Sequence, residues 1–337
     1  MAEFRAVVVG AGRISGVWFP ALAAERVEVA AVVDLDLAAA RRRIAEFGLG
    51  AQASTELART LRRTRPDLVL DLTVPAAHCR VTLTALAAGC HVLGEKPMAA
   101  SLGEARRMVQ AAGAARRIYM VSQTRRWDAR HQALRRAAAA GRIGRLSAVN
   151  CDYYMGPRFG GFRDRMASPL LLDMAIHHFD LARCFTGADA VNVYAREFNP
   201  AGSWYRGAAA ADCLFELTGG VVFSYRGSWC AQGFPTSWNG SWRLVGERGT
   251  LLYEADRPPR AELVSGRAGF TRRVREARVP VPAMEATAWH GALREMLGCL
   301  RTGRRPQTDC RDNLKSLAMV FAALESSRRG RRVPVRA

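Results

Sequence analysis

Residues 6–16 read Ala6-Val7-Val8-Val9-Gly10-Ala11-Gly12-Arg13-Ile14-Ser15-Gly16, an apolar run that leads through two glycines into a helix-like stretch. A strand, a glycine turn and a helix in this order let backbone amides and the positive end of the helix approach a pyrophosphate. Ser15 stands where the dinucleotide fingerprint has its third glycine, and Gly16 follows one place late. We expect Gly10, Gly12, Arg13 and Ile14 to bind a dinucleotide.

The next apolar strand supplies a second element of this fingerprint. It ends in Val32-Val33-Asp34, where a carboxylate can hydrogen-bond the hydroxyls of the adenosine ribose. The alternative is an ordinary glycine turn in which Asp34 caps the following helix. A carboxylate repels a 2′-phosphate and therefore favours NAD, while Arg41 to Arg43 moderate that repulsion and leave NADP open as an alternative.

Outward from the turn, apolar runs alternate with amphipathic stretches as far as Ser122. The pattern predicts strands at 6–9, 27–33, 68–74, 91–93 and 118–121, a weak strand near 51–53, and helices near 13–24, 37–47, 76–88 and 101–114. Alternation of this kind is typical of a parallel sheet covered by helices on both faces. We expect residues 1–123 to form an NAD(P)-binding, doubly wound α/β domain.

After Gln123 the rhythm changes. It predicts helices at 127–140, 169–186, 284–301 and 310–328, and strands at 146–154, 190–198, 210–217, 220–228, 241–246 and 249–255. Gly219-Gly220 and Glu247-Arg248-Gly249 fall where hairpin turns need glycine. We expect residues 124–337 to form a substrate-binding α+β domain with an open, mostly antiparallel sheet and C-terminal helices.

The composition limits the partners of this chain. Its 337 residues carry a net charge of +20, but the arginines are spread over many helix faces without interleaved aromatic residues, which argues against nucleic-acid binding. No run approaches a membrane span, and the first residues lead almost directly into a strand, so we expect a cytoplasmic protein. The eight cysteines are scattered singly, which predicts reduced thiols and no metal site.

Lysine is scarce in this basic chain. Of fifty basic residues only Lys96 and Lys315 are lysines. An arginine cannot usefully lose its proton, whereas the pKa of a buried lysine can be tuned for acid or base chemistry. The alternative is that a few lysines remain by chance in an arginine-rich composition, and Lys315, on an expected surface helix, fits it. Lys96 follows an apolar strand in Gly94-Glu95-Lys96-Pro97, and there we expect a chemical role.

Three motifs together resemble one enzyme family. The glycine turn, Thr73-x-Pro75-x-x-His78 and the stretch from Gly89 to Pro97 are similar to the Gfo/Idh/MocA oxidoreductases. The resemblance implies a Rossmann domain joined to an open-sheet domain, and a nicotinamide cofactor used on sugars, cyclitols or related polyols. It also implies that Glu95 contacts the nicotinamide ribose, and it directs Thr73, Pro75, His78 and Lys96 toward the cofactor.

The second domain offers another signature of this family in residues 168–180. Ser168 is a credible N-cap and Pro169 suits the first helical position, so Asp173 and His177, four residues apart, share one helix face. Buried among leucines, they need polar partners, which a substrate pocket with Lys96 would provide. The alternative is a structural His–Asp pair, and we favour a structural role for His178. Family members usually have two glycines where this chain has Ser168-Pro169.

These groups suggest a mechanism for oxidising a secondary alcohol. His177 is the expected general base, Lys96 polarises the oxygen, and Asp173 orients the pair. Gln123 is expected on the cofactor side, and Arg126, Tyr153 and Arg163 on the substrate side. Two alternatives stay open: an NAD-dependent glycosidase that oxidises its sugar transiently, and a non-catalytic NAD(P)-binding regulator. The resemblance also suggests a homodimer or homotetramer formed through the open sheet.

Overall fold

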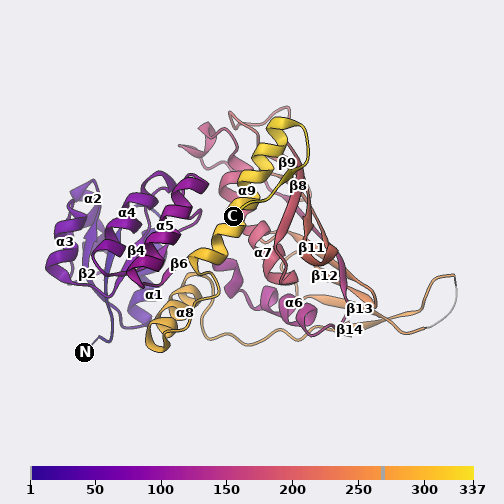
Figure 1. The fold of residues 1–337 in the computed structure, drawn as a ribbon, viewed down its shortest axis with the longest axis horizontal. Helices are drawn as coiled ribbons and strands as arrows, with labels where there is room; N and C mark the ends of the chain where they lie inside the picture. The colour runs from indigo at the N-terminus through magenta and orange to yellow at the C-terminus, as the bar shows by residue number, and fades with distance from the viewer. Residues whose placement is uncertain (1, 267–269) are drawn as a thin grey trace. The chain divides into compact units, whose positions relative to one another are not determined.

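The computed structural model describes residues 2–266 and 270–337, which form two compact units (Figure 1). The first unit contains the chain up to Trp127 together with Glu285–Leu314, and the second contains Asp128–Met284 and Lys315–Ala337. The expected domain division at residue 123 stays a prediction. The compact units differ from it because residues 285–314 pack with the first unit.

The first unit is built on a six-stranded parallel sheet, sheet A, with the order β3-β2-β1-β4-β5-β6. Its strands are β1 Arg5–Val9, β2 Glu28–Val33, β3 Gln52–Ser54, β4 Leu68–Asp71, β5 His91–Gly94 and β6 Tyr119–Val121. The helices between them are α1 Ser15–Ala24, α2 Leu37–Glu46, α3 Leu57–Thr64, α4 Pro75–Ala87 and α5 Leu102–Ala115. Strand β4 is buried throughout and β1 is buried except at Arg5, as expected for a sheet covered on both faces.

A late segment of the chain completes the first unit. Helix α8 (Ala288–Thr302) packs on the 3₁₀-helix η1 (Thr124–Trp127). The contact is close, since a Cβ on Gly291 would lie 2.6 Å from the Cβ of Trp127. His290 Nε2 and Arg294 Nε both lie 2.7 Å from a carboxylate oxygen of Glu25, at the end of α1. These contacts hold α8 against η1 and the end of α1.

The second unit contains a nine-stranded sheet, sheet B, with the order β14-β13-β12-β11-β7-β10-β9-β8-β15. Only β7 and β10 pair in parallel among the described strand pairs of this sheet. The strands are β7 Leu146–Tyr154, β8 Ala190–Phe198, β9 Ala210–Leu217, β10 Val222–Ser228, β11 Ser241–Gly246, β12 Gly249–Tyr253, β13 Arg260–Val264, β14 Val274–Arg278 and β15 Val333–Pro334. Both sheets confirm the predicted fold class.

One face of sheet B is covered by helices. Phe179, on α7 (Ile176–Thr186), packs edge-on against Phe215 of β9 at 4.9 Å and Tyr225 of β10 at 5.3 Å between ring centroids. Helix α6 (Ala129–Ala139) packs against α7. Helix α9 (Cys310–Arg329) begins in the first unit and continues in the second. The aromatic side chains of α7 and the sheet form the core of the second unit.

Several elements differ from the sequence-based expectation. Helix α3 and strands β13, β14 and β15 were not predicted. Helix α3 is only eight residues long and rich in arginine, so its amphipathic pattern covers barely two turns. Strand β13 has a single buried residue and β14 has none, so neither strand shows an apolar alternation. The predicted α-helix over 169–186 is wrong at its start, since Leu170–Ala175 forms a π-helix, η3. Leu, Met and Ala favour an α-helix locally, and only tertiary packing selects the wider turn.

Candidate active site

The carboxyl edge of sheet A collects residues from five strands. Because neighbouring strands pair in parallel, the chain leaves each of them at the same edge. In the order β2-β1-β4-β5-β6, the residues that follow the strands are Asp34, Gly10, Thr73, Glu95 with Lys96, and Gln123. The structure therefore places the principal cofactor residues predicted in the first unit along one sheet edge.

The turn after β1 has a backbone that suits glycine. Gly10 has a φ of +99°, and a Cβ on it would lie 2.7 Å from the carbonyl oxygen of Leu72. At Gly12 a Cβ would meet no heavy atom of the described chain within 4 Å. Arg13 is exposed and Ile14 half-buried at the entry to α1. A left-handed glycine, an open glycine and a helix start fit the pyrophosphate of a dinucleotide.

Asp34 lies beside this turn and holds it. Its Oδ2 accepts a hydrogen bond from the amide of Ala11 at 2.6 Å, and its Oδ1 accepts one from the amide of Asp36 at 2.9 Å. The cap of α2 is Asp36, which accepts from the amide of Ala38. The alternative in which Asp34 caps α2 is therefore wrong. Each Asp34 oxygen keeps acceptor capacity for a ribose hydroxyl.

Arg43 fastens the same turn from α2. Its Nε donates to the carbonyl of Ala11 at 3.2 Å, and its Nη2 donates to the carbonyl of Gly12 at 3.1 Å. Its Nη1 lies 2.7 Å from Glu46. Three donors of this guanidinium are thus used inside the protein, which reduces its capacity to pair with a 2′-phosphate. Of the arginines at 41–43, Arg43 is the one that contacts the turn.

A buried network that the sequence analysis missed lies at the end of β4. Asp71 is fully buried, and its Oδ1 accepts from the Thr73 hydroxyl at 2.6 Å and lies 3.0 Å from Nδ1 of His78. Pro75 begins α4 and carries the chain from Thr73 to His78. Predicted cofactor residues Thr73 and His78 are therefore positioned by a carboxylate. A charge at the end of the apolar run Leu68–Asp71 was the available signal.

Glu95 is held by three N–H groups. Its Oε1 accepts from the indole of Trp18 on α1 at 3.0 Å and from the indole of Trp289 on α8 at 3.1 Å. Its Oε2 accepts from the amide of Lys96 at 3.2 Å. Burial raises the pKa of Glu95, while the charge of Lys96 and the indole donors act to lower it. The two tryptophans fix the residue that precedes Lys96, and no local sequence pattern connects them to it.

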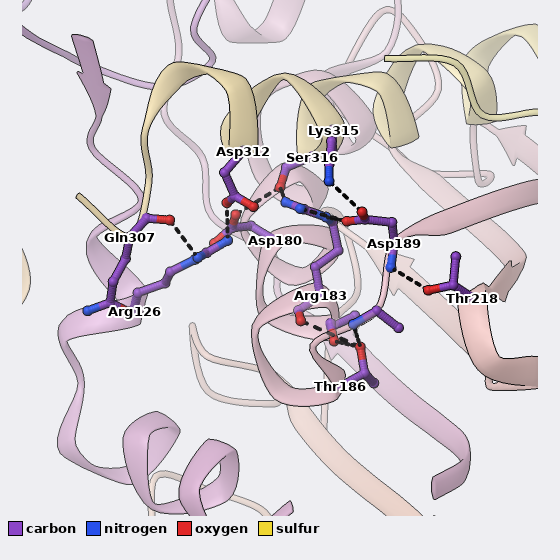
Figure 2. A network of polar contacts seen from close by, with 12 residues as sticks. Arg126, Asp180, Arg183, Thr186, Asp189, Thr218, Gln307, Asp312, Lys315 and Ser316 are labelled. Carbon is purple, nitrogen blue, oxygen red and sulfur yellow. Dashed lines mark hydrogen bonds and ion pairs between the residues drawn. The ribbon is translucent and has the colours of Figure 1, made fainter. Parts of the chain in front are cut away.

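Gln123 and Arg126 both follow β6 within a few residues, but their surroundings differ. The side-chain oxygen and nitrogen of Gln123 are buried, and within residues 2–266 and 270–337 neither has a hydrogen-bond partner. Arg126 is buried as well, and donates to the carbonyl of Gln307 at 3.1 Å and to Asp312 at 2.9 Å (Figure 2). Gln123 thus has polar capacity for a ligand. The substrate role expected for Arg126 stays a prediction, beside a structural role that the contacts show.

In the second unit, Asp173 lies on η3 and His177 on α7. Nε of Arg163 donates to Oδ2 of Asp173 at 2.6 Å, and Arg163 belongs to the short 3₁₀-helix η2 (Arg163–Arg165). The side chain of Asp173 is 13% exposed and that of Arg163 is 32% exposed. His177 is buried at the start of α7. The structure therefore joins two of the predicted substrate residues, Arg163 and Asp173, in one ion pair.

Other polar residues of this helix belong to the core. Asp180 accepts from the hydroxyl of Ser316, which in turn accepts from Arg183, and all three are buried (Figure 2). His178 is fully buried, with its ring 4.7 Å from that of Tyr153 and 5.5 Å from that of Tyr225. These contacts agree with a structural role for His178. Tyr153 is fully buried too, and its substrate role stays a prediction.

A surface depression in the second unit does not coincide with these residues. It has a volume of about 640 Å³ and is lined by small and charged residues that include Gly141, Arg145, Thr186 and Arg248. None of the predicted catalytic or binding residues lines it. The candidate site is therefore defined by the polar residues described above, and this depression is not part of it.

Comparison with protein families matches both halves of the chain. Residues 4–123 match the oxidoreductase family with an NAD-binding Rossmann fold, and residues 131–252 match the GFO/IDH/MocA C-terminal domain. The chain belongs to the Gfo/Idh/MocA oxidoreductase family. It is an NAD-binding oxidoreductase, as the glycine turn and sheet edge of the first unit lead one to expect.

Individual members of the Gfo/Idh/MocA family are similar over much of the chain. A D-apiose dehydrogenase from Paraburkholderia graminis is 30% identical over 92% of this chain and 83% of its own length. An inositol 2-dehydrogenase from Renibacterium salmoninarum is 33% identical over 55% of this chain and 56% of its own. The crystal structure of an oxidoreductase from Agrobacterium radiobacter with NAD⁺, L-tartaric acid and magnesium has a TM-score of 0.86 at 22% identity, covering 99% of both chains. This last likeness shows the fold.

The departure from the Gfo/Idh/MocA pattern at Ser168-Pro169 has a structural counterpart. The hydroxyl of Ser168 donates to Oε1 of Glu197 on β8 at 3.1 Å. Burial raises the pKa of Glu197, and the Ser168 hydrogen bond acts to lower it. The pair ties the start of η3, which carries Asp173, to sheet B. A pair of glycines has no side chain with which to make this contact.

Apolar helices that could traverse a bilayer do not occur in the described part of the chain. The cytoplasmic location expected from the sequence stays a prediction.

Proposed function

We propose that this protein is a nicotinamide-dependent dehydrogenase that moves a hydride between NAD and a secondary alcohol of a sugar, a sugar derivative or a cyclitol. The observation that carries the proposal is the edge of sheet A, where the glycine turn, Asp34, Thr73, Lys96 and Gln123 follow adjacent parallel strands. The similar D-apiose and inositol dehydrogenases support the substrate class.

The residues of the first unit fit a dinucleotide. Gly10 and Gly12 with the start of α1 suit the pyrophosphate, Asp34 the adenosine ribose, and the unpartnered amide of Gln123 the nicotinamide half. When bound, NAD supplies the acceptor for the hydride. Asp34 places a negative charge where NADP carries its 2′-phosphate, and Arg43 is engaged with the turn and Glu46. We therefore propose NAD as the preferred cofactor.

Three residues would carry the chemistry at the alcohol. His177 accepts the hydroxyl proton, and Lys96 donates a hydrogen bond to the oxygen as the carbonyl forms. Asp173 orients the imidazole and stabilises the positive charge that it gains with the proton. The proposal requires Lys96 and His177 to act on one hydroxyl. Glu95 fixes the backbone beside Lys96 rather than taking part in proton transfer, because its oxygens already accept three N–H groups.

Cofactor reduction tests this function. The purified protein with NAD would be supplied with neutral sugars, sugar acids, inositols and glycosides, and the formation of NADH followed by its absorbance. Net NADH with at least one of these alcohols is the expected result. Release of an aglycone without net NADH would indicate the glycosidase alternative. Tight NAD binding with no turnover of any compound would contradict the dehydrogenase proposal and favour the regulatory one.

We also propose that the protein forms a homo-oligomer through sheet B. Exposed apolar side chains, namely Tyr194, Phe198, Leu214 and Val222, lie on its strands. Apolar residues on one open sheet face commonly mark a protein–protein interface. The solution mass gives the test. A mass of twice or four times the chain is expected, and Leu214→Lys should reduce it, whereas a monomer at micromolar concentration contradicts the proposal.

A further inference from the structure

The segment between β7 and η3, residues 155–169, is held in place by its neighbours in the second unit. The carbonyl of Pro157 accepts from the indole of Trp204 at 3.2 Å and from the hydroxyl of Tyr205 at 2.9 Å. The amide of Arg206 donates to the carbonyl of Asp164 at 2.8 Å. Contacts near the start and in the middle of the segment give the side chains between them defined positions.

Exposed aromatic rings lie on and beside this segment. Phe159 is 41% exposed, Phe162 49% and Trp238 43%. Phe159 lies 6.1 Å from Trp238 and 5.4 Å from the buried Trp229, whose ring stacks on Tyr205. The ring of Phe159, which lies next to Trp238 and is backed by this buried aromatic layer, offers a surface on which the apolar face of a ring-shaped ligand can pack. We refer to Phe159, Phe162 and Trp238 as the aromatic platform.

Arg163 is oriented by this platform and by Asp173. Its guanidinium carbon lies 5.1 Å above the ring of Phe159 and 4.7 Å above that of Phe162. Its Nε donates to Asp173, while its two terminal nitrogens meet no acceptor among the residues that the structure describes. Arginine binds carboxylates through two parallel N–H donors of its planar fork. One edge of the fork is thus available at a fixed orientation.

The local charge favours a single negative charge on the ligand. Residues 155–175 carry one excess positive charge, since they contain three arginines (Arg158, Arg163 and Arg165) and two aspartates (Asp164 and Asp173). Arg158 also lies over an aromatic ring, 4.1 Å above Trp204. A phosphate dianion or a diphosphate would need more compensation next to two aspartates, whereas one carboxylate balances the excess.

We propose that Arg163 binds the carboxylate of a sugar-acid substrate, a uronic or aldonic acid whose ring or chain packs on the aromatic platform. The inference rests on the proposed dehydrogenase function and narrows its substrate class. Arg163 connects the substrate carboxylate to Asp173, so a correctly seated acid also orients Asp173. A neutral sugar of the same stereochemistry lacks this connection.

Paired substrates test the inference. Glucuronate against glucose, and galacturonate against galactose, differ only at the carboxylate, and kcat/KM with NAD gives their ratio. We expect the acid to be favoured by at least about tenfold in the wild type, since bidentate charge-assisted hydrogen bonds are strong. Arg163→Met should lower that ratio about tenfold, and Arg163→Lys, which keeps the charge without the fork, should lower it less.

The control removes the same charge from the neighbouring loop. Arg206→Met should keep the acid-to-neutral ratio within about twofold, because an exposed charge outside the contact acts weakly. Comparing acid with neutral sugar in the same variant cancels any general effect of Arg163 on Asp173. A wild-type preference for neutral sugars, or an equal ratio in the wild type and Arg163→Met, overturns the proposal.

A binding measurement separates this inference from the proposed function. Glucuronate would be titrated into the wild type and Arg163→Met in the presence of NADH by calorimetry, with thermal melting to verify that each variant is folded. Binding of the acid that weakens about tenfold in Arg163→Met supports the carboxylate site even if no alcohol is oxidised. Turnover of neutral polyols together with absent or unchanged acid binding leaves the dehydrogenase proposal standing and overturns the carboxylate site.

Discussion

Two carboxylates of the predicted site are held in different ways. Glu95, in the first unit, is 7% exposed and accepts hydrogen bonds from two tryptophan indoles and a backbone amide. Asp173, in the second unit, pairs with Arg163, whose side chain is 32% exposed. Three N–H donors fix a buried carboxylate in one position, whereas a partly exposed arginine can share its donors with an arriving ligand. The cofactor unit is therefore preformed, and the substrate unit retains adjustable contacts.

The largest effect is expected from replacing Lys96, the residue of the first unit to which the chemistry is assigned. Lys96→Met is nearly isosteric but uncharged, so it should lower turnover at least about a hundredfold while NAD affinity stays within a few-fold. Steady-state kinetics and titration of NADH fluorescence provide the two values. Lys315→Met is the matched control, because the other lysine pairs with Asp189 on the surface. Equal turnover in the wild type and Lys96→Met would remove Lys96 from the mechanism.

A second variant sharpens the description of the preformed unit. Asp34→Asn removes a charge but keeps an oxygen that can accept from the amide of Ala11. The ratio of kcat/KM for NAD to that for NADP should fall about tenfold, because repulsion of the 2′-phosphate is lost. Dissociation constants for NADH and NADPH serve if turnover is too slow. A constant ratio would show that Asp34 does not select the cofactor.

A third measurement compares the two carboxylate environments directly. Trp289→Phe removes one N–H donor from the buried Glu95 and should lower the free energy of unfolding by about 1–2 kcal/mol. Arg163→Met removes a partly exposed ion pair and should lower it by less than about 1 kcal/mol. Urea unfolding of both variants gives the values. A larger loss for Arg163→Met than for Trp289→Phe would reverse the comparison.

The smallest effect concerns the pair that ties η3 to sheet B. Burial raises the pKa of Glu197, which means that folding favours the protonated carboxyl. The folded protein therefore has the full contribution of Glu197 to stability below the ordinary pKa of the carboxyl, and loses it as the pH rises through the raised pKa. Glu197→Gln should therefore raise the melting temperature by about 1–3 °C at pH 7 and give no gain near pH 4. Thermal melts across this range, with the exposed Glu276→Gln as control, would show it. A gain that is independent of pH would contradict the assignment.

How much of the site could be predicted depends on how far apart the interacting residues lie in the sequence. The glycine turn, Asp34 and Lys96 stand at strand ends, and a parallel sheet brings strand ends to one edge, so their shared location followed from the strand pattern. Trp18 and Trp289 lie far from Glu95 in the chain, and Arg126 meets Asp312 only through tertiary packing. No periodic pattern connects such residues. Asp71 was visible as a charge in an apolar strand, but its partners were not.

The sequence by itself determined the parallel α/β half, the open second sheet and the residue types available for chemistry. Hydrophobic period and glycine conformation are local properties, and they act before distant segments meet. Tertiary structure decided the indole contacts of Glu95, the packing of residues 285–314 with the first unit, and the π-helical turn under Asp173. Each of these depends on side chains brought together from separate parts of the chain, where burial and hydrogen bonding outweigh local propensity.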